Sequence, residues 1–421
     1  MKYLKEKLFS ILLFSSLLAG FTCANPEKSY KILFIMGKWG HGPSAQAVIA
    51  ALKRISSNIQ VDTLADHEVS YWDYTKLYDN IMRYGMAEIA NLYFTTLPLI
   101  SQDSMFSGGV NPRLLKAKIQ NGYDLVICNF PRTQRMADLI CKALKIPFMV
   151  IPSDLGEPYL GFWIRPTPYI IYLLGSKYLR QSASDHPNVA PISGMVLRPE
   201  FRHIRDISKR DMKARLGLDP DKKMVLVLFG TAGSDVMLEI AKIARQDKTR
   251  QYVFICASYK ELKYRIDQLK QRHFKVEGYI NNIHEYMRAA DVFIGKPGGG
   301  CTSECIQCET PIILRHKYLW DTMPQEVPNL CYVKEHGLGK IIKSYQKELL
   351  TAIDELILNP PSHFPHNNAA DQCAVSIAHF LKCREALKNR VKSMDEIARS
   401  SPGLGGLISN SLPRKSAGWL S

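Results

Sequence analysis

Short apolar runs that end at glycine recur along this chain and predict buried parallel strands. The first run, Tyr30–Met36 (YKILFIM), is almost continuously apolar and is followed by Gly37. A run without alternating polar residues is typical of a strand that is covered on both faces. After a glycine-bearing segment, apolar residues recur at helical spacing in Ser44–Ile55. This part of the chain is therefore expected to form a strand, a glycine loop and a helix.

The same alternation continues and then restarts in the second half of the chain. Asp124–Cys128 and Pro147–Ile151 are two more apolar runs, with helical spacing in Arg135–Leu144 between them. The pattern restarts at Lys223–Phe229, which a turn containing Gly230 and a helix follow. The later expected strands are Gln251–Cys256, Lys275–Gly278, Val292–Gly295 and Pro311–Leu314. Strands that alternate with helices favour doubly wound parallel sheets, so we predict an α/β chain of two Rossmann-like domains that face a central cleft.

The domain boundary is expected near Met195–Lys223, which contains an Arg-Pro pair, a charged helix and a turn. We place the first domain at residues 25–197 and the second at residues 198–390, and we expect the last helix to cross back to the first domain. Residues 391–421 are rich in Gly, Ser and Pro toward their end and are expected to form a loose tail. Neither glycine loop has the G-x-G-x-x-G pattern, which disfavours binding of a dinucleotide.

The first 24 residues have the features of a targeting segment. Three lysines within the first seven residues precede the apolar run Leu8–Phe21, and small residues follow near Ala24. These are the three parts of a secretory signal peptide. The run is shorter than the ~20 apolar residues of a membrane-spanning helix. Residues 1–24 are therefore expected to be either a signal peptide or an N-terminal membrane anchor.

A glycine-rich turn in Ala289–Pro311 is the strongest candidate for an anion site. The expected strand Asp291–Gly295 leads into Lys296, and three successive glycines follow, namely Gly298, Gly299 and Gly300. Glycines let backbone N–H groups approach an anion closely, and a helix N-terminus adds a favourable dipole. A plain strand–helix turn is the simpler interpretation, but such a turn does not need three glycines, which cost backbone entropy.

The helix after this turn is expected to begin near Thr302. Thr302 or Ser303 would cap it or donate a hydrogen bond to a phosphate. Glu304 would lie in the first turn, where its carboxylate could accept hydrogen bonds from two vicinal hydroxyls, such as those of a ribose. Downstream, Gln325 and Glu326 lie in a polar loop between a strand and a helix. Ligands of such folds bind at the carboxyl ends of the strands, so these two residues are candidates for contacts to sugar hydroxyls.

Composition narrows the class of protein but not its activity. The 421 residues are 46% hydrophobic and 22% charged, which excludes a collagen-like or low-complexity chain, and no stretch fits a polytopic membrane protein. Ten cysteines, scattered through apolar runs, indicate reduced thiols in the core. The chain has 55 Lys and Arg against 39 Asp and Glu, a net charge of +16. That charge favours a polyanionic partner, which could be nucleic acid, an anionic membrane surface or a phosphorylated ligand.

Motifs along the chain then resemble a known family. In the first domain they are Gly40-His41 and Ser44-Ala45, and the domain junction carries Ser193–Phe201. The remaining motifs, in chain order, are Arg215–Pro220, Val276–Tyr279, Met287–Asp291, Gly295–Gly298 with Glu304, Pro311, Gln325-Glu326 and Asn329. In this combination the chain resembles the monogalactosyldiacylglycerol synthases and bacterial diacylglycerol glucosyltransferases of glycosyltransferase family 28. It is more distantly similar to the bacterial enzyme that adds N-acetylglucosamine to the cell-wall lipid precursor.

The resemblance implies a two-domain GT-B glycosyltransferase that moves a hexose from a UDP-sugar to a lipid acceptor, 1,2-diacylglycerol being favoured, with inversion. A related UDP-N-acetylglucosamine-dependent transferase and a non-catalytic nucleotide-sugar-binding protein at a membrane surface remain alternatives. The first domain would bind the acceptor and the second the donor. The donor residues that it implies are Gly230, Lys296, Gly298, Gly299, Gly300, Thr302, Glu304, Gln325 and Glu326. The chain departs from the family at Ala257–Tyr259, where relatives carry a glycine-containing stretch near the donor base.

For catalysis the resemblance implies His41 beside the reacting hydroxyl. A histidine is suited to this because its ordinary pKa lies near neutrality. Asp154 matches an acidic position of the family and would be either an alternative base or the group that orients His41. The leaving diphosphate can be stabilised by helix-terminal N–H groups and a cation, so no metal or other cofactor is expected. Asp219-Pro220-Asp221 has the D-x-D form of a metal motif, but its place after a helix indicates a turn.

Two rival interpretations remain. Cys301, Cys305 and Cys308 have the spacing of a radical-SAM iron–sulfur motif, yet they lie in an expected helix after a phosphate-type turn. The basic residues of Lys209–Arg215 and Lys260–Arg272 are not interleaved with aromatics as in a nucleic-acid motif, so no nucleic-acid partner is expected. An anionic membrane surface accounts better for the charge, and Tyr84–Ile100 and Pro168–Gly175 are candidates for dipping into a membrane interface or for buried core helices. The expected location is therefore at a membrane, through peripheral or N-terminal attachment.

Overall fold

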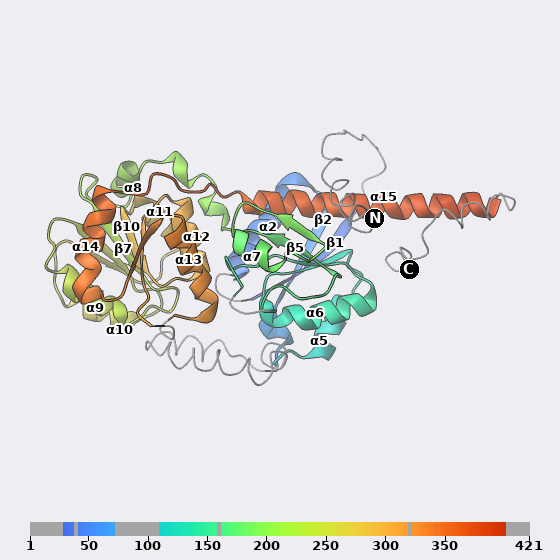
Figure 1. Cartoon of the computed structure of the whole chain (residues 1–421), viewed down its shortest axis with the longest axis horizontal. Coiled ribbons are helices and arrows are strands. Elements are labelled where there is room, and N and C mark those ends of the chain that lie inside the picture. The colour runs from blue at the N-terminus through green and yellow to red at the C-terminus, as the bar shows by residue number, and fades with distance from the viewer. Residues whose placement is uncertain (1–27, 38–40, 72–108, 158–160, 319–321, 401–421) are drawn as a thin grey trace.

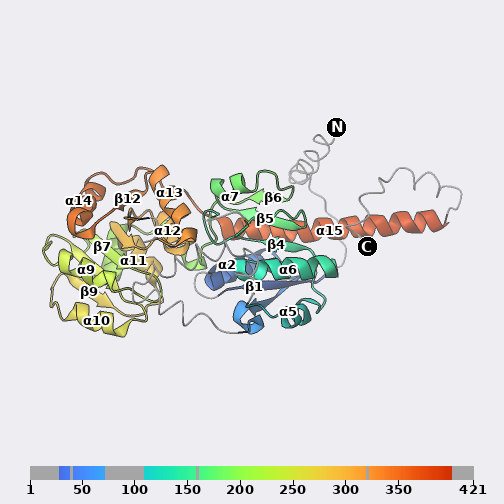
Figure 2. The same ribbon diagram turned by 60° about the horizontal axis from the view of Figure 1, so that its bottom comes forward.

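A computed structural model describes residues 28–37, 41–71, 109–157, 161–318 and 322–400 of the chain, with side chains to residue 387. The targeting segment, the apolar run Tyr84–Ile100 and the last 21 residues lie outside the described residues. The described residues form two parallel six-stranded sheets with helices on both faces, seen side by side in Figures 1 and 2. This confirms the predicted α/β class and its two Rossmann-like sheets.

The first sheet extends from residue 30 to residue 191. Its strands are β1 (Tyr30–Met36), β2 (Ile59–Ala65), β3 (Leu125–Cys128), β4 (Phe148–Val150), β5 (Ile170–Leu174) and β6 (Val189–Pro191). They are parallel and run in the order β2-β1-β3-β4-β5-β6. The helices of this part are α2 (His41–Ile55), the 3-10 turn η2 (Asp66–Val69), α5 (Pro112–Ile119), α6 (Pro131–Leu144) and α7 (Lys177–Ser182).

Burial on both faces explains why β1 lacks polar alternation. Ile32 and Phe34 pack into one apolar cluster together with α2, whereas Leu33 and Ile35 pack into another cluster on the opposite face. Successive side chains of a strand point to opposite faces, so a sheet with helices on both sides requires apolar residues at every position. The segment Pro168–Gly175 follows the same rule. It holds the buried strand β5, and neither the interfacial segment nor the core helix considered above is correct.

The second sheet extends from residue 224 to residue 342. Its strands are β7 (Met224–Leu228), β8 (Gln251–Ile255), β9 (Phe274–Glu277), β10 (Val292–Gly295), β11 (Ile312–Arg315) and β12 (Gly339–Ile342). Its helices and 3-10 turns are η3 (Pro199–Phe201), η4 (Ile204–Asp206), α8 (Lys209–Arg215), α9 (Val236–Ala244), α10 (Lys260–Asp267), α11 (Ile283–Ala289), α12 (Gly299–Gln307), η5 (Pro324–Glu326), α13 (Val327–Glu335) and α14 (Tyr345–Leu358).

The strand order of the second sheet is the dinucleotide-fold order. It runs β9-β8-β7-β10-β11-β12, so that the chain reverses direction across the sheet between β7 and β10. In open parallel sheets, ligands bind outside the carboxyl ends of the strands at such a switch point. The first sheet has its own switch point between β1 and β3. These two places are where a functional site is expected.

The last element of the described residues is a long helix, α15 (Ala369–Ser400), which the chain reaches from the second domain and which lies along the first domain. Cys373, Ile377 and Leu381 pack into the cluster that also contains α2 and one face of β1. Further along α15, the Arg384 guanidinium donates a hydrogen bond to the backbone oxygen of Asp124 in the first domain, at 3.0 Å. Figures 1 and 2 both show α15 lying along the first domain. Within the described residues, the chain thus crosses between the two domains twice.

Candidate functional site

Two glycine turns of the second domain meet at its switch point. Gly230 follows β7 and has a positive φ of 72°, a conformation that glycine adopts without strain. A Cβ at Gly230 would lie 3.4 Å from the Cε atom of Lys296, which follows β10. Gly295, the last residue of β10, lies so close to the neighbouring strand that a Cβ would be 2.5 Å from the Leu228 carbonyl oxygen. Glycine is therefore needed for this close approach of the two turns.

Helix α12 begins earlier than its side chains indicate. Gly298 is the N-cap residue and Gly299 the first helical residue, so the predicted start near Thr302 is wrong, and so is the predicted capping role of Thr302 or Ser303. Glu304 accordingly lies in the second turn and not in the first. The helix N-terminus, with its unpaired N–H groups and positive dipole end, is formed by the three glycines themselves. Backbone without side chains is thus what this terminus presents to the switch point.

Thr302 is one of the polar groups that have no protein partner here. Its side chain is buried, and its hydroxyl makes no hydrogen bond within the described part of the chain. A buried hydroxyl without a partner costs about 1–3 kcal/mol. The side-chain oxygen of Asn329 is in the same situation, while the amide nitrogen of Asn329 donates to the Pro297 oxygen at 2.7 Å. These oxygens are therefore candidates for contact with a ligand.

Lys296 and Glu326 form an ion pair beside the glycine turn. The Lys296 ammonium donates to Glu326 Oε1 at 2.8 Å, and both side chains are largely buried. Glu326 belongs to η5, which also carries the half-buried Gln325. A Cβ at Gly298 would lie 3.5 Å from Lys296 Cε and 3.6 Å from Glu326 Oε1. The pair is thus in contact with the start of α12.

Glu304 is held from the domain junction by Arg198. The Arg198 guanidinium donates from Nε at 2.9 Å and from Nη2 at 2.8 Å, in both cases to Glu304 Oε1. Burial raises the pKa of Glu304, and the positive charge of Arg198 opposes that shift. Because both nitrogens contact one oxygen, Glu304 Oε2 has no hydrogen-bond donor among the described residues and could accept from a ligand.

The first domain places a histidine at its own switch point. His41 is the first residue of α2, whereas the helical spacing in the sequence begins only at Ser44. Its Nδ1 atom lies 3.1 Å from the Asn129 backbone oxygen and 2.5 Å from Ser153 Oγ. A carbonyl oxygen can only accept, so Nδ1 carries the proton and Nε2 is the unprotonated nitrogen. Asn129 also donates from its amide nitrogen to the His41 oxygen, at 2.6 Å.

Burial keeps His41 neutral. It lowers the pKa of His41 to about 4, and the hydrogen bond to the Asn129 oxygen opposes this shift only in part. The ring edge of Phe130 packs against the imidazole, with ring centroids 4.8 Å apart. Phe130 also lies over Gly37, where a Cβ would meet its ring at 2.4 Å. His41 is therefore positioned as an uncharged base with its basic nitrogen at Nε2.

Asp154 does not orient His41. Its Oδ2 atom accepts a hydrogen bond from Trp163 Nε1 at 2.9 Å, and the groups in contact with His41 Nδ1 are Asn129 and Ser153. Burial raises the pKa of Asp154 to about 7; the Trp163 bond and the charge of Lys296 lower it, and the charge of Glu326 raises it. Asp154 is therefore electrostatically coupled to the ion pair of the second domain.

The two halves of the site meet at Gly299. A Cβ at this residue would lie 3.3 Å from Asp154 Oδ1, 3.3 Å from the Ser153 oxygen and 3.2 Å from Met195 Sδ. The backbone of α12 thus approaches the loop after β4 so closely that a side chain at this position would be crowded. Because the Ser153 hydroxyl contacts His41, a short path joins His41 to the glycine turn. These contacts connect seven of the predicted site residues, namely His41, Asp154, Gly230, Lys296, Gly298, Gly299 and Glu326. Gly300, Thr302 and Glu304 lie on the same helix α12, and Gln325 lies beside Glu326 in η5.

Sequence reasoning missed three residues of this site. Asn129 and Ser153 orient His41, and Arg198 holds Glu304. Arg198 belongs to the junction motif but had no role assigned. Asn129 directly follows β3 and Ser153 closely follows β4. Their position at the carboxyl ends of neighbouring strands was the signal that could have identified them.

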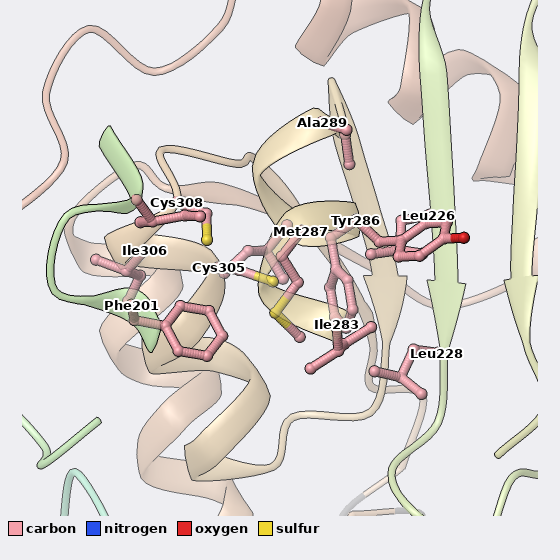
Figure 3. Close-up of a cluster of buried hydrophobic side chains, with 14 of the residues drawn as sticks. Phe201, Leu226, Leu228, Ile283, Tyr286, Met287, Ala289, Cys305, Ile306 and Cys308 are labelled. Atoms are coloured by element: carbon pink, nitrogen blue, oxygen red, sulfur yellow. The ribbon is translucent and has the colours of Figure 1, made fainter. Parts of the chain in front are cut away.

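The cysteines with iron–sulfur spacing serve the core. Figure 3 shows Cys305 and Cys308 among Phe201, Ile306 and Met287 in one hydrophobic cluster. Burial raises the pKa of the Cys308 thiol above its ordinary range, as it does for Cys305. Thiols in such surroundings are poor metal ligands because the thiolate is the ligating form. Within the described ranges no group of three or more His, Cys, Asp or Glu side chains is arranged to hold a metal ion.

The other rival motifs have local structural roles. Asp219 Oδ1 accepts a hydrogen bond from the Asp221 backbone nitrogen at 3.0 Å, which is the turn chemistry expected for this Asp-Pro-Asp segment. In the charged helix α8, Lys213 is buried and pairs with Asp291 at 2.6 Å, so the basic residues of this helix do not all face solvent. Among the helices of the described ranges, none is both long and apolar enough to cross a bilayer.

Sequence comparisons connect the chain to lipid glycosyltransferases. Residues 224–381 match the model of the glycosyltransferase family 28 C-terminal domain. Monogalactosyldiacylglycerol synthase from Spinacia oleracea is 25% identical over 358 residues, which cover 78% of this chain and 66% of the spinach protein, just under two thirds of its length. A processive diacylglycerol beta-glucosyltransferase from Staphylococcus saprophyticus is 24% identical over 376 residues, which cover 85% of this chain and 92% of that protein.

Solved structures share the fold at low sequence identity. MurG from Acinetobacter baumannii has a TM-score of 0.52 and is 12% identical, with 82% of this chain and 98% of that chain covered. A UDP-GlcNAc 2-epimerase from Neisseria meningitidis, solved with UDP-GlcNAc bound, has a TM-score of 0.54 and is 15% identical, with 84% and 100% covered. These likenesses show the fold alone. The family model and the sequence relatives confirm the resemblance to the family described above.

Proposed function

We propose that this chain is a glycosyltransferase that transfers a hexose from a UDP-sugar to a lipid acceptor, 1,2-diacylglycerol. Its match to the model of the family 28 C-terminal domain and its GT-B fold support the proposal. The single observation that carries the proposal is the meeting of two unlike half-sites at Gly299. One offers a glycine helix terminus with a lysine beside it, and the other offers a neutral histidine. A group transfer from a charged leaving group to a hydroxyl needs both.

On the donor side, the diphosphate would bind at the N-terminus of α12. The N–H groups of the glycine turn and the dipole stabilise an anion, and the Lys296 ammonium lies beside that turn. Thr302 supplies a hydroxyl that has no protein partner in the described structure. Glu304 would accept hydrogen bonds from the ribose hydroxyls, and Gln325 and Glu326 would contact the donor sugar.

On the acceptor side, His41 would act as the general base. The acceptor hydroxyl oxygen forms a bond to the anomeric carbon while the bond from that carbon to the β-phosphate oxygen breaks. The hydroxyl proton passes to His41 Nε2, and the electron pair of the broken bond leaves with UDP. Attack from the face opposite the leaving group inverts the anomeric centre. Asn129 and Ser153 hold the imidazole in the tautomer that this step needs.

Charge development on the leaving group is met by this chain's own groups. The α12 terminus and Lys296 together provide positive potential where UDP departs. We therefore propose that transfer needs no metal and no other cofactor. Treatment with EDTA should leave the rate of transfer unchanged.

We propose that the reaction takes place at a membrane surface, which a lipid acceptor requires and the basic composition favours. The net charge of +16 favours anionic lipid, where each basic residue near the surface contributes about 1 kcal/mol. Because UDP-sugars are cytosolic, residues 1–24 would act as an anchor that leaves the two domains on the cytosolic side.

A donor-by-acceptor screen tests the proposal. UDP-glucose, UDP-galactose and UDP-N-acetylglucosamine are each incubated with the full chain and with anionic vesicles that contain diacylglycerol, and glycolipid is measured by mass spectrometry. Hexosyl-diacylglycerol is the expected product. If product forms only with UDP-N-acetylglucosamine, the transferred sugar is an N-acetylamino sugar and not a hexose. Binding of UDP without any product would indicate a non-catalytic binding protein and overturn the enzymatic proposal.

A further inference from the structure

The second domain contains a cavity of about 540 Å³ on the edge opposite the donor site. Lys223, Asp291 and Pro311 line it, and each directly precedes a strand, β7, β10 and β11 respectively. In a parallel sheet the amino ends of the strands share one edge, and the glycine turns of the donor site follow the carboxyl ends. The cavity is therefore separated from the donor site by the length of the sheet.

The cavity has the size of a ligand site. Small-molecule sites span about 300–1,000 Å³ and combine an apolar wall with a few polar groups. Here the apolar wall comes from the end of α14 and the segment after it, with Leu356, Ile357 and Phe364 among its residues. The polar wall comes from α8 and from the residues before the strands. A single inorganic ion would fill only part of this volume.

The two acidic residues of the lining form ion pairs with cations that lie outside the cavity. Asp291 accepts from the Lys213 ammonium at 2.6 Å, and Glu309 accepts from Arg288 at 2.8 Å. Neither Lys213 nor Arg288 lines the cavity. The charges that remain on the lining side are therefore positive, and they belong to Arg205, Lys209 and Lys223.

Two of these cations have capacity for a ligand. Arg205 is committed to the fold, since its guanidinium donates to four backbone oxygens, those of Ile306, Gln307, Phe364 and Pro365. Lys209 makes one such bond, to the Ala290 oxygen at 2.6 Å, and two of its three N–H bonds have no acceptor among the described residues. Lys223 lies 3.4 Å from Asp291 and its side chain is half exposed.

The ammonium group of Lys209 is destabilised by burial and would be stabilised by a negative charge nearby. Burial lowers the pKa of its ammonium to about 8, although the Asp291 charge opposes that shift. The positive charges of Arg288 and Lys213 act in the same direction as burial. An anion in the cavity would lie against the group that most needs one.

We propose that this cavity is a second ligand site, which binds a phosphate monoester between Lys209 and Lys223 and packs its organic part against the wall formed by α14 and the segment after it. Two ammonium groups match a dianionic phosphate, and the apolar wall distinguishes an ester from free phosphate. The histidines at its rim, His363 and His366, offer further donors on the segment that leads to α15. The site is independent of the transferase proposal.

Titration calorimetry on the full chain tests this site while the donor site is occupied. The protein is saturated with UDP and then titrated in separate experiments with inorganic phosphate, glycerol 3-phosphate and monomeric dihexanoyl phosphatidic acid. We expect glycerol 3-phosphate or the phosphatidic acid to bind more tightly than inorganic phosphate. Preference for the former assigns a soluble ester as the ligand, and preference for the latter assigns a lipid headgroup. Absence of phosphate-ester binding in the presence of UDP would overturn the proposal.

Variants locate the binding. Lys223→Glu removes an exposed cation without disturbing the core, and Lys209→Gln removes the buried one; each should weaken binding about tenfold or more. Lys242→Glu, an exposed change on α9 outside the lining, makes the same charge reversal as Lys223→Glu and should leave the affinity unchanged. If Lys209→Gln does not fold, Lys223→Glu decides alone. Equal loss in Lys223→Glu and Lys242→Glu would show general charge attraction and contradict a built site.

Discussion

The two switch points of this chain have different electrostatic properties. In the second domain, a glycine helix terminus and the Lys296–Glu326 pair supply positive potential through backbone and a partly compensated cation. In the first domain, burial removes charge, and His41 is neutral with its tautomer fixed by Asn129 and Ser153. One half is suited to holding an anion and the other to receiving a proton. The same strand–turn–helix geometry thus presents either positive potential or a neutral imidazole, according to which groups lie at the turn.

The largest effect is expected from removing the base while leaving the anion site intact. His41→Ala should lower kcat about 10²–10⁴-fold, the range of general base catalysis. UDP affinity should stay unchanged, because the diphosphate contacts lie in the second domain. Steady-state kinetics and UDP titration on the same preparation check both halves. A parallel loss of UDP binding would mean that the two half-sites are not separable.

The converse change removes the cation of the anion site. Lys296→Met should weaken UDP binding about tenfold or more, because a charge-assisted contact is lost and Glu326 is left as an uncompensated buried carboxylate. Glu326→Gln is the matched control, because it removes the partner charge and keeps Lys296. If Lys296→Met and Glu326→Gln weaken binding equally, the lysine acts through the fold and not on the diphosphate.

The pH profile of kcat/KM separates His41 from Asp154 as the base. A base must be deprotonated, and burial lowers the pKa of His41 to about 4 while it raises the pKa of Asp154 to about 7. If His41 is the base, kcat/KM should stay level as the pH falls from 7 and decline only toward pH 4. A decline near pH 7 that Asp154→Asn abolishes would assign the base to Asp154.

The same shifts act on stability with opposite signs. The pKa of His41 is lower in the folded state, so the unfolded chain binds more protons between pH 4 and 6.5, and this histidine adds stability as the pH rises through that window. The pKa of Asp154 is higher in the folded state, so its contribution falls as the pH rises from about 4 to 7. In Asp154→Asn, urea unfolding should therefore show a steeper gain of stability with pH than in the unaltered chain.

A smaller effect comes from the unpartnered hydroxyl of Thr302. Thr302→Val removes a buried oxygen that has no hydrogen bond in the described structure, so the free energy of unfolding without ligand should rise by about 1 kcal/mol. With UDP present the order should reverse, because the hydroxyl then has a phosphate to contact. Denaturant unfolding with and without UDP measures both. Destabilisation of Thr302→Val in the absence of nucleotide would contradict the interpretation of Thr302 as a ligand group.

The smallest effect concerns Ala257, whose backbone conformation favours glycine. Ala257 has a positive φ of 52°, a conformation that costs a non-glycine residue about 1–2 kcal/mol. Ala257→Gly should therefore raise the free energy of unfolding by about 0.5–1 kcal/mol, as the relief of strain exceeds the entropy of glycine. An unchanged or lower stability in urea unfolding would show that the backbone here is not strained.

Much of the fold could be predicted because it depends on local signals. The strands β1 and β10 have the predicted bounds Tyr30–Met36 and Val292–Gly295, since each is a buried apolar run that ends beside glycine. The start of α12 could not be predicted in this way. Thr302 and Ser303 have the side chains of caps, yet the helix starts at Gly299, whose backbone lies close to Ser153 and Asp154 of the first domain.

The partners of His41 depend on contacts that the local sequence does not record. Asn129 and Ser153 are 88 and 112 residues from His41 in the chain, and only the alignment of β1, β3 and β4 in one sheet brings them together. The burial of Lys213 was missed for the same reason, since its partner Asp291 lies 78 residues away. Residue types gave the candidates, whereas tertiary structure selected their contacts.

The most direct test of the account is the affinity for UDP of the unaltered chain and of Glu304→Ala, measured by titration calorimetry. Glu304 lies on the helix that carries the glycine turn, and its carboxylate is held in place by Arg198. We expect the unaltered chain to bind UDP at one site. We expect Glu304→Ala to bind UDP about tenfold more weakly, since contacts to the ribose hydroxyls are lost. An unaltered chain that does not bind UDP, or a Glu304→Ala variant that binds it equally well, would contradict the assignment of the donor site.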